Sequence, residues 1–181
     1  MTKKVSVLID GYNLYHAIDN LKIPVLKWID PLVVSREFAR RDHGFEIIRA
    51  KFFTAPPIHK SKQVQEKYFN YIKVLKFHCN VDVIEGKFKR KLLTYKDSQR
   101  KVYTRSTHEE KESDVNLALA ILEDSYEKIS DKILVITNDS DISPAIRMAL
   151  RKNSKLKISV ITPPLTNAKR ANYDLINACG D

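Results

Sequence analysis

The chain of 181 residues has little of what marks disulfide-rich, fibrous or membrane-inserted proteins. It contains 2 cysteines, 4 glycines and 7 prolines, which excludes a disulfide framework and collagen-like or low-complexity chains. Cys79 and Cys179 lie far apart and outside any Cys/His cluster, so no zinc site is indicated. No apolar run approaches the roughly 18 residues of a membrane span, and the first one ends at Asp10, too early for a signal peptide. We therefore expect a soluble cytoplasmic protein that is neither secreted nor inserted in a membrane.

The charge is strongly unbalanced towards the basic side. Lys and Arg number 32 against 22 Asp and Glu, a formal charge of +10, while 43% of the residues are hydrophobic. The length and composition predict one globular domain over residues 1–181 with an anionic partner. The excess is concentrated in two segments. Residues 87–111 hold 9 Lys/Arg and 3 Asp/Glu, and residues 147–170 hold 7 Lys/Arg and no acid.

Short apolar runs alternate with segments of helical periodicity. Strands are predicted at residues 4–9, 45–54, 81–85, 133–137 and 157–162, and a basic β-excursion at about 87–105. Helices are predicted at 13–20, 31–41, 61–78, from Ser113 onwards, at 143–151 and in a C-terminal tail at about 167–178. This alternation favours the α/β class, a sandwich of helices on a mainly parallel central sheet.

Carboxylates follow two of the predicted strands. Asp10 ends the first strand, and Asp139 and Asp141 come just after a later one. Parallel strands end at one edge, where clustered carboxylates repel one another unless a hard cation such as Mg²⁺ or Mn²⁺ compensates them. Asp114, in the first turn of the helix at Ser113, is the natural fourth acid. Each acid alone is also explained as a turn former, a cap or a first-turn residue, but together they favour a metal site able to cleave phosphodiesters.

Three segments resemble the signature motifs of NYN domains, which belong to the PIN-like nuclease superfamily. They are Val7-Leu8-Ile9-Asp10-Gly11-Tyr12-Asn13-Leu14, Lys111-Glu112-Ser113-Asp114-Val115-Asn116-Leu117-Ala118 and Val135-Ile136-Thr137-Asn138-Asp139-Ser140-Asp141-Ile142-Ser143-Pro144. The resemblance covers roughly residues 4–162. It implies a three-layer, Rossmann-like (PIN-like) sandwich, a site for Mg²⁺ or Mn²⁺, and cleavage of RNA that leaves 5′-phosphate and 3′-hydroxyl ends.

The resemblance also assigns roles to single residues. It matches Asp10, Asp114, Asp139 and Asp141 to the catalytic, metal-holding acids, and Asn13 to the asparagine that supports the site. The chain departs from the family pattern in four places, with Glu112 and Asn138 where glycines are common, Ala120 where a further acid is common, and Ile142 where an aromatic residue is common. Ala120 bears on whether a second metal position is occupied. Glu112 either compensates for it or is a solvent-exposed acid at the start of the helix.

The two basic segments flank the acidic motifs and suit a phosphate backbone. The residues predicted to bind substrate are Asn13, Lys89, Arg90, Lys91, Arg105, Lys111 and Arg147. In the first segment, Phe88, Tyr95 and Tyr103 interleave with the cations. They either stack on bases of a single strand or form the buried face of a hairpin.

The sequence therefore predicts a divalent-metal-dependent (endo)ribonuclease acting on single-stranded or structured RNA, with no membrane partner. A homo-oligomer is compatible with the sequence, but nothing in it indicates one. One alternative is a non-catalytic RNA-binding or regulatory NYN module, which Ala120 favours. Another is a Toprim-like, Mg²⁺-dependent phosphotransfer domain; such domains normally carry a glutamate after the first strand, where this chain has Asp10.

Overall fold

A computed structural model of the chain describes residues 2–41, 45–96, 98, 100–164 and 172–179. The strands are β1 (Lys3–Asp10), β2 (Phe45–Thr54), β3 (Asp82–Glu85), β4 (Lys87–Lys96), β5 (Val102–Lys111), β6 (Lys132–Ile136) and β7 (Lys157–Ile161). The α-helices are α1 (Gly11–Asn20), α2 (Pro31–Arg41), α3 (Lys62–Phe77), α4 (Ser113–Glu127), α5 (Ser143–Lys152) and α6 (Tyr173–Cys179). Two short 3₁₀ helices, η1 (Pro24–Trp28) and η2 (Ser140–Ile142), complete the described elements.

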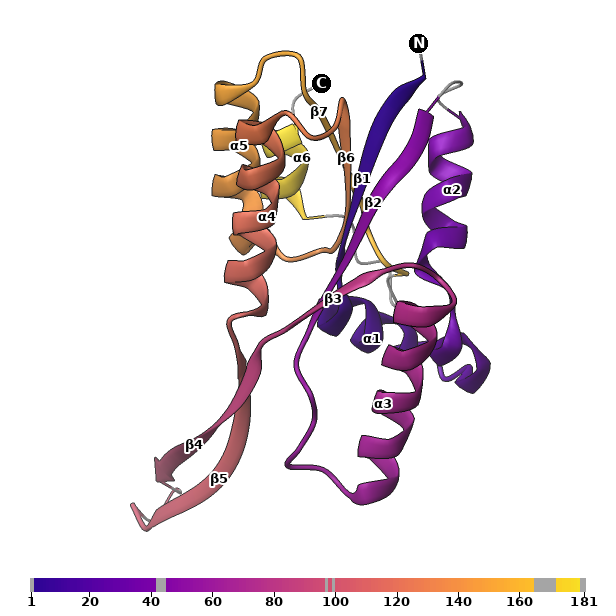
Figure 1. Ribbon diagram of the computed structural model, residues 1–181. Helices are drawn as coiled ribbons and strands as arrows, with labels where there is room; N and C mark the ends of the chain where they lie inside the picture. Colours follow the sequence, from indigo (N-terminus) through magenta and orange to yellow (C-terminus); the bar gives the residue numbers. More distant parts are fainter. Residues whose placement is uncertain (1, 42–44, 97, 99, 165–171, 180–181) are drawn as a thin grey trace.

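Five strands form a parallel sheet in the order β3-β2-β1-β6-β7 (Figure 1). β1 lies in the middle and pairs with β2 on one side and β6 on the other. The chain first builds the sheet outwards from β1 through β2 to β3, then returns to the other side of β1 for β6 and β7. Such a reversal brings the carboxyl ends of the two central strands together at the place where α/β proteins bind ligands. The predicted α/β class with a mainly parallel sheet is confirmed.

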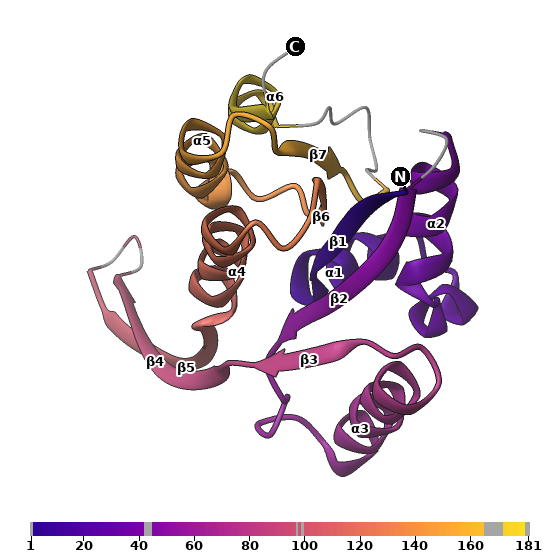
Figure 2. The same ribbon diagram turned by 45° about the horizontal axis from the view of Figure 1, so that its top comes forward.

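Helices cover both faces of the sheet, with α1, α2 and α3 on one face and α4, α5 and α6 on the other (Figures 1 and 2). Two apolar cores result. One contains Leu14 and Leu75 from the first group of helices, and the other contains Leu117 and Ile146 from the second. Strand alternation in β1 sends Val5, Val7 and Ile9 into the first core and Leu8 into the second. Asp10 lies two residues after Leu8 in the strand, so its side chain points to the same face of the sheet, the face that α4 covers.

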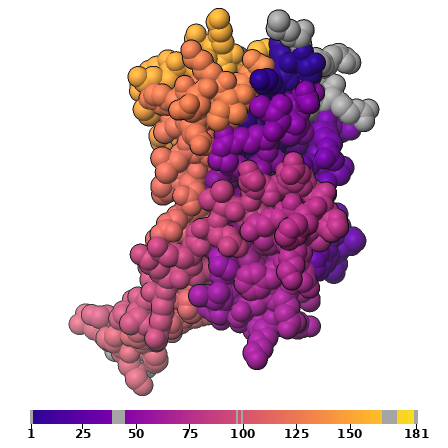
Figure 3. All heavy atoms as spheres, viewed as in Figure 1, coloured from indigo at the N-terminus to yellow at the C-terminus, as the bar shows by residue number. Residues whose placement is uncertain are grey.

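Strands β4 and β5 form a separate antiparallel hairpin that extends away from the sandwich (Figures 1 and 3). Its pairs run from Lys87↔Lys111 to Lys96↔Val102. The β-excursion predicted to end at residue 105 therefore continues to Lys111. Residues 106–111 contain no apolar side chain, so their sequence carried no strand signal.

Helix α6, the last described element, packs on α5 and β7. The predicted tail helix at about 167–178 agrees with α6 in its second part, while residues 167–171 lie outside the described residues. Among the helices that the structure describes, none is both long enough and apolar enough to cross a lipid bilayer.

Candidate active site

Asp10 lies at the carboxyl end of β1, where its side chain is 4% exposed. Both of its carboxylate oxygens accept hydrogen bonds. The backbone N–H of Asn13 donates to Oδ1 at 2.9 Å, which caps helix α1, and Thr137 Oγ1 donates to Oδ2 at 2.8 Å. Thr137 directly follows β6, so this second bond ties the ends of the two central strands together across the switch in strand order.

Burial raises the pKa of Asp10 from 3.8 to about 6. The negative charges of Asp114 and Asp139 act in the same direction, while the bonds from Asn13 and Thr137 partly oppose them. Burial is thus the main cause of the raised pKa, and the neighbouring acids add to it. The group is therefore costly to ionise in the absence of a cation.

Hydrogen bonds fix the loop after β6 against the loop after β1. The Oδ1 atom of Asn13 accepts the backbone N–H of Asn138 at 3.1 Å, and Thr137 Oγ1 accepts that of Asp139 at 3.1 Å. Asp139 Oδ1 in turn accepts the backbone N–H of Asp141 at 2.9 Å and caps η2. This chain of short-range bonds positions two of the predicted acids. The side chain of Asp141 is exposed.

Asn138, which stands where the family commonly has glycine, connects the site to the C-terminal part of the chain. Its Oδ1 accepts the backbone N–H of Asn172 at 3.0 Å, just before α6. A glycine at this position would lack that bond. The substitution thus gives this chain a contact between the loop after β6 and the segment that leads into its last helix.

Asp114 and Glu110 bring further carboxylates to the site from α4 and β5. Asp114 lies in the first turn of α4, and partial burial together with the charges of Asp139 and Asp141 raises its pKa. Glu110 lies near the end of β5. Burial raises its pKa from 4.5 to about 7, aided by the charges of Asp10 and Asp114 and opposed by a hydrogen bond from Ser113 Oγ. Electrostatic interactions therefore link all four predicted acids, and Glu110 is a fifth acid in this group.

Glu110 was not predicted from the sequence, where Glu112 was considered as the extra acid. Glu112 instead forms an exposed ion pair with Lys87. Ala120, at the position where the family commonly has a further acid, is buried among apolar residues, about 9 Å along the helix axis from Asp114. Strand alternation could have pointed to Glu110. If β5 continues to residue 111, the side chains of His108 and Glu110 lie on the same face of the hairpin. Without apolar residues in that stretch, the strand itself was not recognised.

Two glycines allow close approaches beside the site. A Cβ on Gly11 would lie 2.3 Å from the Phe52 ring and 2.8 Å from the Phe53 carbonyl oxygen, so only glycine lets α1 begin against β2 directly after Asp10. A Cβ on Gly86 would lie 2.4 Å from the carbonyl oxygen of Lys111. That contact lies at the base of the hairpin, where the residue before β4 lies against the last residue of β5.

The donors suit a hard divalent cation. Within the described ranges, no three His, Cys, Asp or Glu side chains converge closely enough to enclose an ion by themselves. Mg²⁺, however, commonly keeps several waters and is held by one or two carboxylates together with substrate phosphates, so a closed protein cage is not needed. The pKa values of Asp10, Glu110 and Asp114 are all raised, as expected for oxygen ligands that lack a compensating charge. The residues fit a partly hydrated ion of this kind.

The hairpin separates the predicted substrate-binding residues onto two faces, because directly paired residues of an antiparallel ladder share a face. What we call the inner face carries Phe88 and Arg90 paired with Glu110 and His108. The outer face carries the remaining predicted cations of the hairpin together with a stacked tyrosine pair: Lys89, Lys91, Arg105, Lys111, Tyr95 and Tyr103. Since Glu110 belongs to the acidic cluster, the inner face is the one that adjoins it.

The predicted cations also differ in their partners. Lys91 and Lys111 both pair with Glu109 at 3.1 Å, and Arg90 Nε donates to Ser106 Oγ at 2.9 Å. Arg147 is exposed in α5. These residues therefore do not form one continuous basic track.

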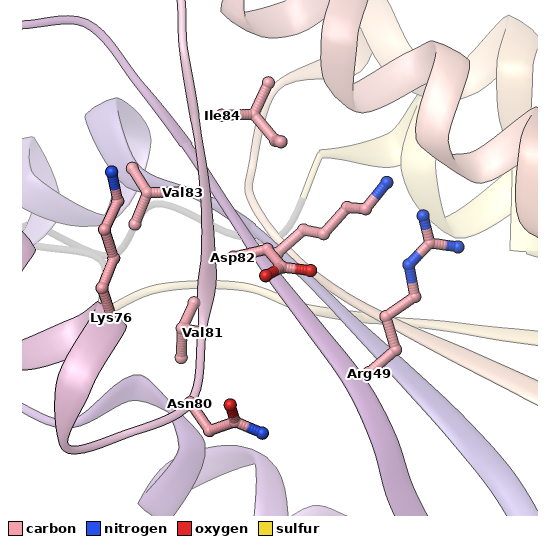
Figure 4. Close-up of a pocket in the computed structure, with 8 residues that line it drawn as sticks. Arg49, Lys76, Asn80, Val81, Asp82, Val83 and Ile84 are labelled. Carbon is pink, nitrogen blue, oxygen red and sulfur yellow. The ribbon is translucent and has the colours of Figure 1, made fainter.

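A separate cavity of about 510 Å³ lies along the sheet edge at β3, on elements other than those that carry the acids (Figure 4). Arg49, Lys51 and Lys76 contribute its cations, and the chain from Asn80 to Ile84 forms its other wall. Arg49 and Lys51 also bind Glu123 of α4, at 2.6 and 3.1 Å. The concave feature and the acidic cluster are therefore distinct places on the molecule.

Comparisons with known proteins place the chain in a family. The model of the NYN domain matches residues 4–181. A Pseudomonas putida protein named 6-hydroxy-3-succinoylpyridine 3-monooxygenase is 30% identical over 203 aligned residues, which cover 96% of this chain and 64% of that protein. The chain thus spans less than two-thirds of this relative.

A crystal structure of a Vibrio parahaemolyticus protein of unknown function has the same fold, with a TM-score of 0.55, 16% sequence identity and coverage of 99% of this chain and 90% of that one. This likeness supports the architecture alone. The family match argues against the Toprim-like alternative. It spans all three acidic motifs and both basic segments, and the chain therefore belongs to the NYN domain family.

Proposed function

We propose that the protein is a divalent-metal-dependent ribonuclease that hydrolyses RNA phosphodiester bonds. The observation that carries the proposal is the acidic cluster at the ends of β1 and β6, where burial and mutual repulsion raise the pKa values of Asp10, Glu110 and Asp114. Such groups gain most from a bound cation and a phosphate substrate. Membership of the NYN family, whose fold is nuclease-like, supports the same reading.

Asp10, Asp114, Asp139 and Asp141 are the residues that would hold Mg²⁺ or Mn²⁺. When bound, such an ion lowers the pKa of a coordinated water and offsets the charge that develops on a phosphate. Asp10 is fixed by its two donors, and Thr137 connects it to the backbone of Asp139. The sequence motif alone does not predict these two contacts of Thr137.

Asn13 and Glu110 have roles that follow from their contacts. The amide oxygen of Asn13 is engaged by Asn138, so its NH₂ group is the part able to donate to a phosphate oxygen. Burial raises the pKa of Glu110, and its carboxyl lies within electrostatic range of Asp10 and Asp114, so it is the side chain placed to give or take a proton during hydrolysis. A glutamate with an ordinary pKa near 4.5 would be ionised at neutral pH and would have no proton to give.

Cleavage of a defined set of single-stranded and structured RNAs, with Mn²⁺ or Mg²⁺, tests the proposal. Asp10→Asn keeps the side-chain shape and Asp141→Ala removes an exposed acid; each should lower kcat/KM by roughly 100-fold or more. Asp82→Asn, an exposed acid on the edge strand, is the matched control and should remain within about twofold of wild type. Intact RNA under all conditions, or unchanged cleavage by Asp141→Ala, would reject the enzyme.

A non-catalytic RNA-binding module is a second candidate, favoured by one observation: Ala120 supplies no acid at the position where the family commonly has one. On this alternative, binding depends on salt because it is carried by phosphate contacts. It should survive alanine substitution of all four aspartates, and no RNA should be cleaved. Loss of binding in that quadruple variant would count against it.

The relative's name suggests a third candidate, oxygenation of a pyridine ring. The test is incubation with 6-hydroxy-3-succinoylpyridine, dioxygen and a two-electron reductant, followed by mass spectrometry. Transfer of one oxygen atom from isotopically labelled dioxygen to a product of the pyridine, whether or not the succinoyl group is lost, and its abolition in Asp10→Asn, would favour this activity over the nuclease. An unchanged pyridine would leave it as a property of the relative.

A further inference from the structure

A row of aromatic and imidazole rings leads from the acidic site onto the inner face of the hairpin. Tyr12, two residues after Asp10, has its ring centroid 6.2 Å from that of Phe88. The Phe88 ring lies 4.5 Å from His59, in the loop before α3, and His59 stacks on His108 of β5 at 4.3 Å with planes 10° apart. Four segments, distant from one another in sequence, thus contribute to one row of rings.

The row begins at the acids. Tyr12 lies two residues after Asp10, the N-cap of α1, and within electrostatic range of Glu110. Glu110 is paired with Phe88 across the hairpin, and His108 is paired with Arg90 one step further out. The order along the inner face is therefore carboxylate and phenyl first, then imidazole and guanidinium.

The rings are not sealed into a core. Tyr12 is 41% exposed and His108 is exposed, while Phe88 and His59 are half-buried. The His59 Nδ1 atom is buried, and among the described residues none forms a hydrogen bond with it. Tyr12 and His108, at the two ends of the row, thus present ring surface to solvent, and His59 carries a buried nitrogen without a described partner.

We infer that this row is a binding platform for the bases of single-stranded RNA, whose phosphates pass Arg90 on their way to the acids. The inference rests on the proposed function. Bases of a single strand are splayed out and stack on aromatic and imidazole rings, whereas bases within a duplex are already stacked on their neighbours. A row of exposed rings beside a phosphate-binding site therefore selects unpaired RNA. The stacked pair Tyr95 and Tyr103, on the outer face, lies outside this platform.

Binding of a labelled 12-nucleotide single-stranded RNA, measured by fluorescence anisotropy in EDTA at pH 8, tests the platform. The comparison ligands are an abasic strand of the same length and charge and a duplex of the same sequence. We expect wild type to bind the single strand at least about fivefold more tightly than the abasic strand.

The variants are Phe88→Leu, which keeps apolar volume without a ring, and His108→Ala. Each should weaken binding of the single strand about fivefold or more, leave binding of the abasic strand unchanged, and preserve the dependence on salt concentration. Tyr103→Ala, an aromatic residue of the same hairpin on the outer face, is the matched control and should bind like wild type.

Equal affinity for the normal and abasic strands, or an equal loss in Tyr103→Ala and Phe88→Leu, would overturn the inference. Cleavage of the same RNA in Mn²⁺ is measured separately. Base-dependent binding without cleavage would support the platform while rejecting the nuclease. Cleavage without base dependence would support the nuclease while overturning the platform.

Discussion

The sandwich and the hairpin are held together by different means. In the sandwich, side chains such as Val7 and Leu117 are almost completely buried, one in each of the two apolar cores on either side of the sheet. In the hairpin, both strands are exposed along most of their length, and Leu92 is 61% exposed. An isolated hairpin is marginally stable in water, so this one depends on its base at Gly86, Phe88 and Glu110. The sandwich thus positions the acids, and the hairpin presents groups to a partner.

The largest expected effect separates the two regions by stability. Leu117→Ala, in the core beneath α4, should lower the free energy of unfolding by about 2–5 kcal/mol, because it leaves a cavity in a packed interior. Leu92→Ala, the same substitution on the hairpin, should change it by less than about 0.5 kcal/mol. Urea unfolding measures both. Similar losses in the two variants would show that the hairpin is packed as tightly as the core.

The pH dependence of stability reports the electrostatic cost of the acidic cluster. The pKa of Asp10 is about 6 in the folded protein against an ordinary 3.8, so the folded state binds more protons than the unfolded chain between these values. In EDTA, the free energy of unfolding should therefore fall as pH rises from about 4 to about 7. Asp10→Asn should lessen this fall by about 2–3 kcal/mol.

Asp82→Asn serves as the control for this pH series, since it removes an acid from the exposed edge strand. Its pH dependence should match that of wild type. An equally steep fall in Asp10→Asn would mean that ionisation of Asp10 is not costly in the folded state.

Gly11→Ala should disturb the junction between the sandwich and the site. Its Cβ would clash with the Phe52 ring and the Phe53 carbonyl oxygen, so we expect a loss of about 1–3 kcal/mol in the free energy of unfolding, together with reduced cleavage. Asn20→Ala, at the exposed far end of the same helix, is the control for thermal unfolding and activity. Full stability in Gly11→Ala would contradict the close approach.

The smallest effect compares the two faces of the hairpin. Arg90→Ala, on the inner face, should weaken RNA binding several-fold and reduce the slope of log affinity against log salt by about 1. Lys89→Ala, on the outer face, should change affinity by less than about twofold. Equal effects in a salt titration would place the RNA around both faces.

Much of the sandwich could be predicted from the sequence, because its strands are short apolar runs. The predicted boundaries of α2 (31–41) and of β2 (45–54) agree with the structure. The acids Asp10, Asp139 and Asp141 could be placed at one edge for the same reason, since each follows a buried strand and parallel strands end together.

The hairpin and its acid were harder to predict. The end of β5 consists of polar and charged residues, so neither strand periodicity nor apolar content marked it, and Glu110 was missed while Glu112 was considered instead. The row of rings joins segments near residues 12, 59, 88 and 108. No local pattern relates positions so far apart in sequence, because their proximity follows from the strand order and the direction of the hairpin.

The dependence of RNA cleavage on Mn²⁺ concentration tests the central claim most directly. Wild type should cleave a single-stranded RNA only when the ion is present. Asp139→Asn should require a higher concentration, by roughly 10- to 100-fold, while Asp82→Asn follows the wild-type curve. Cleavage that persists in EDTA, or superimposable curves for wild type and Asp139→Asn, would contradict the assignment of these acids to a metal-dependent nuclease site.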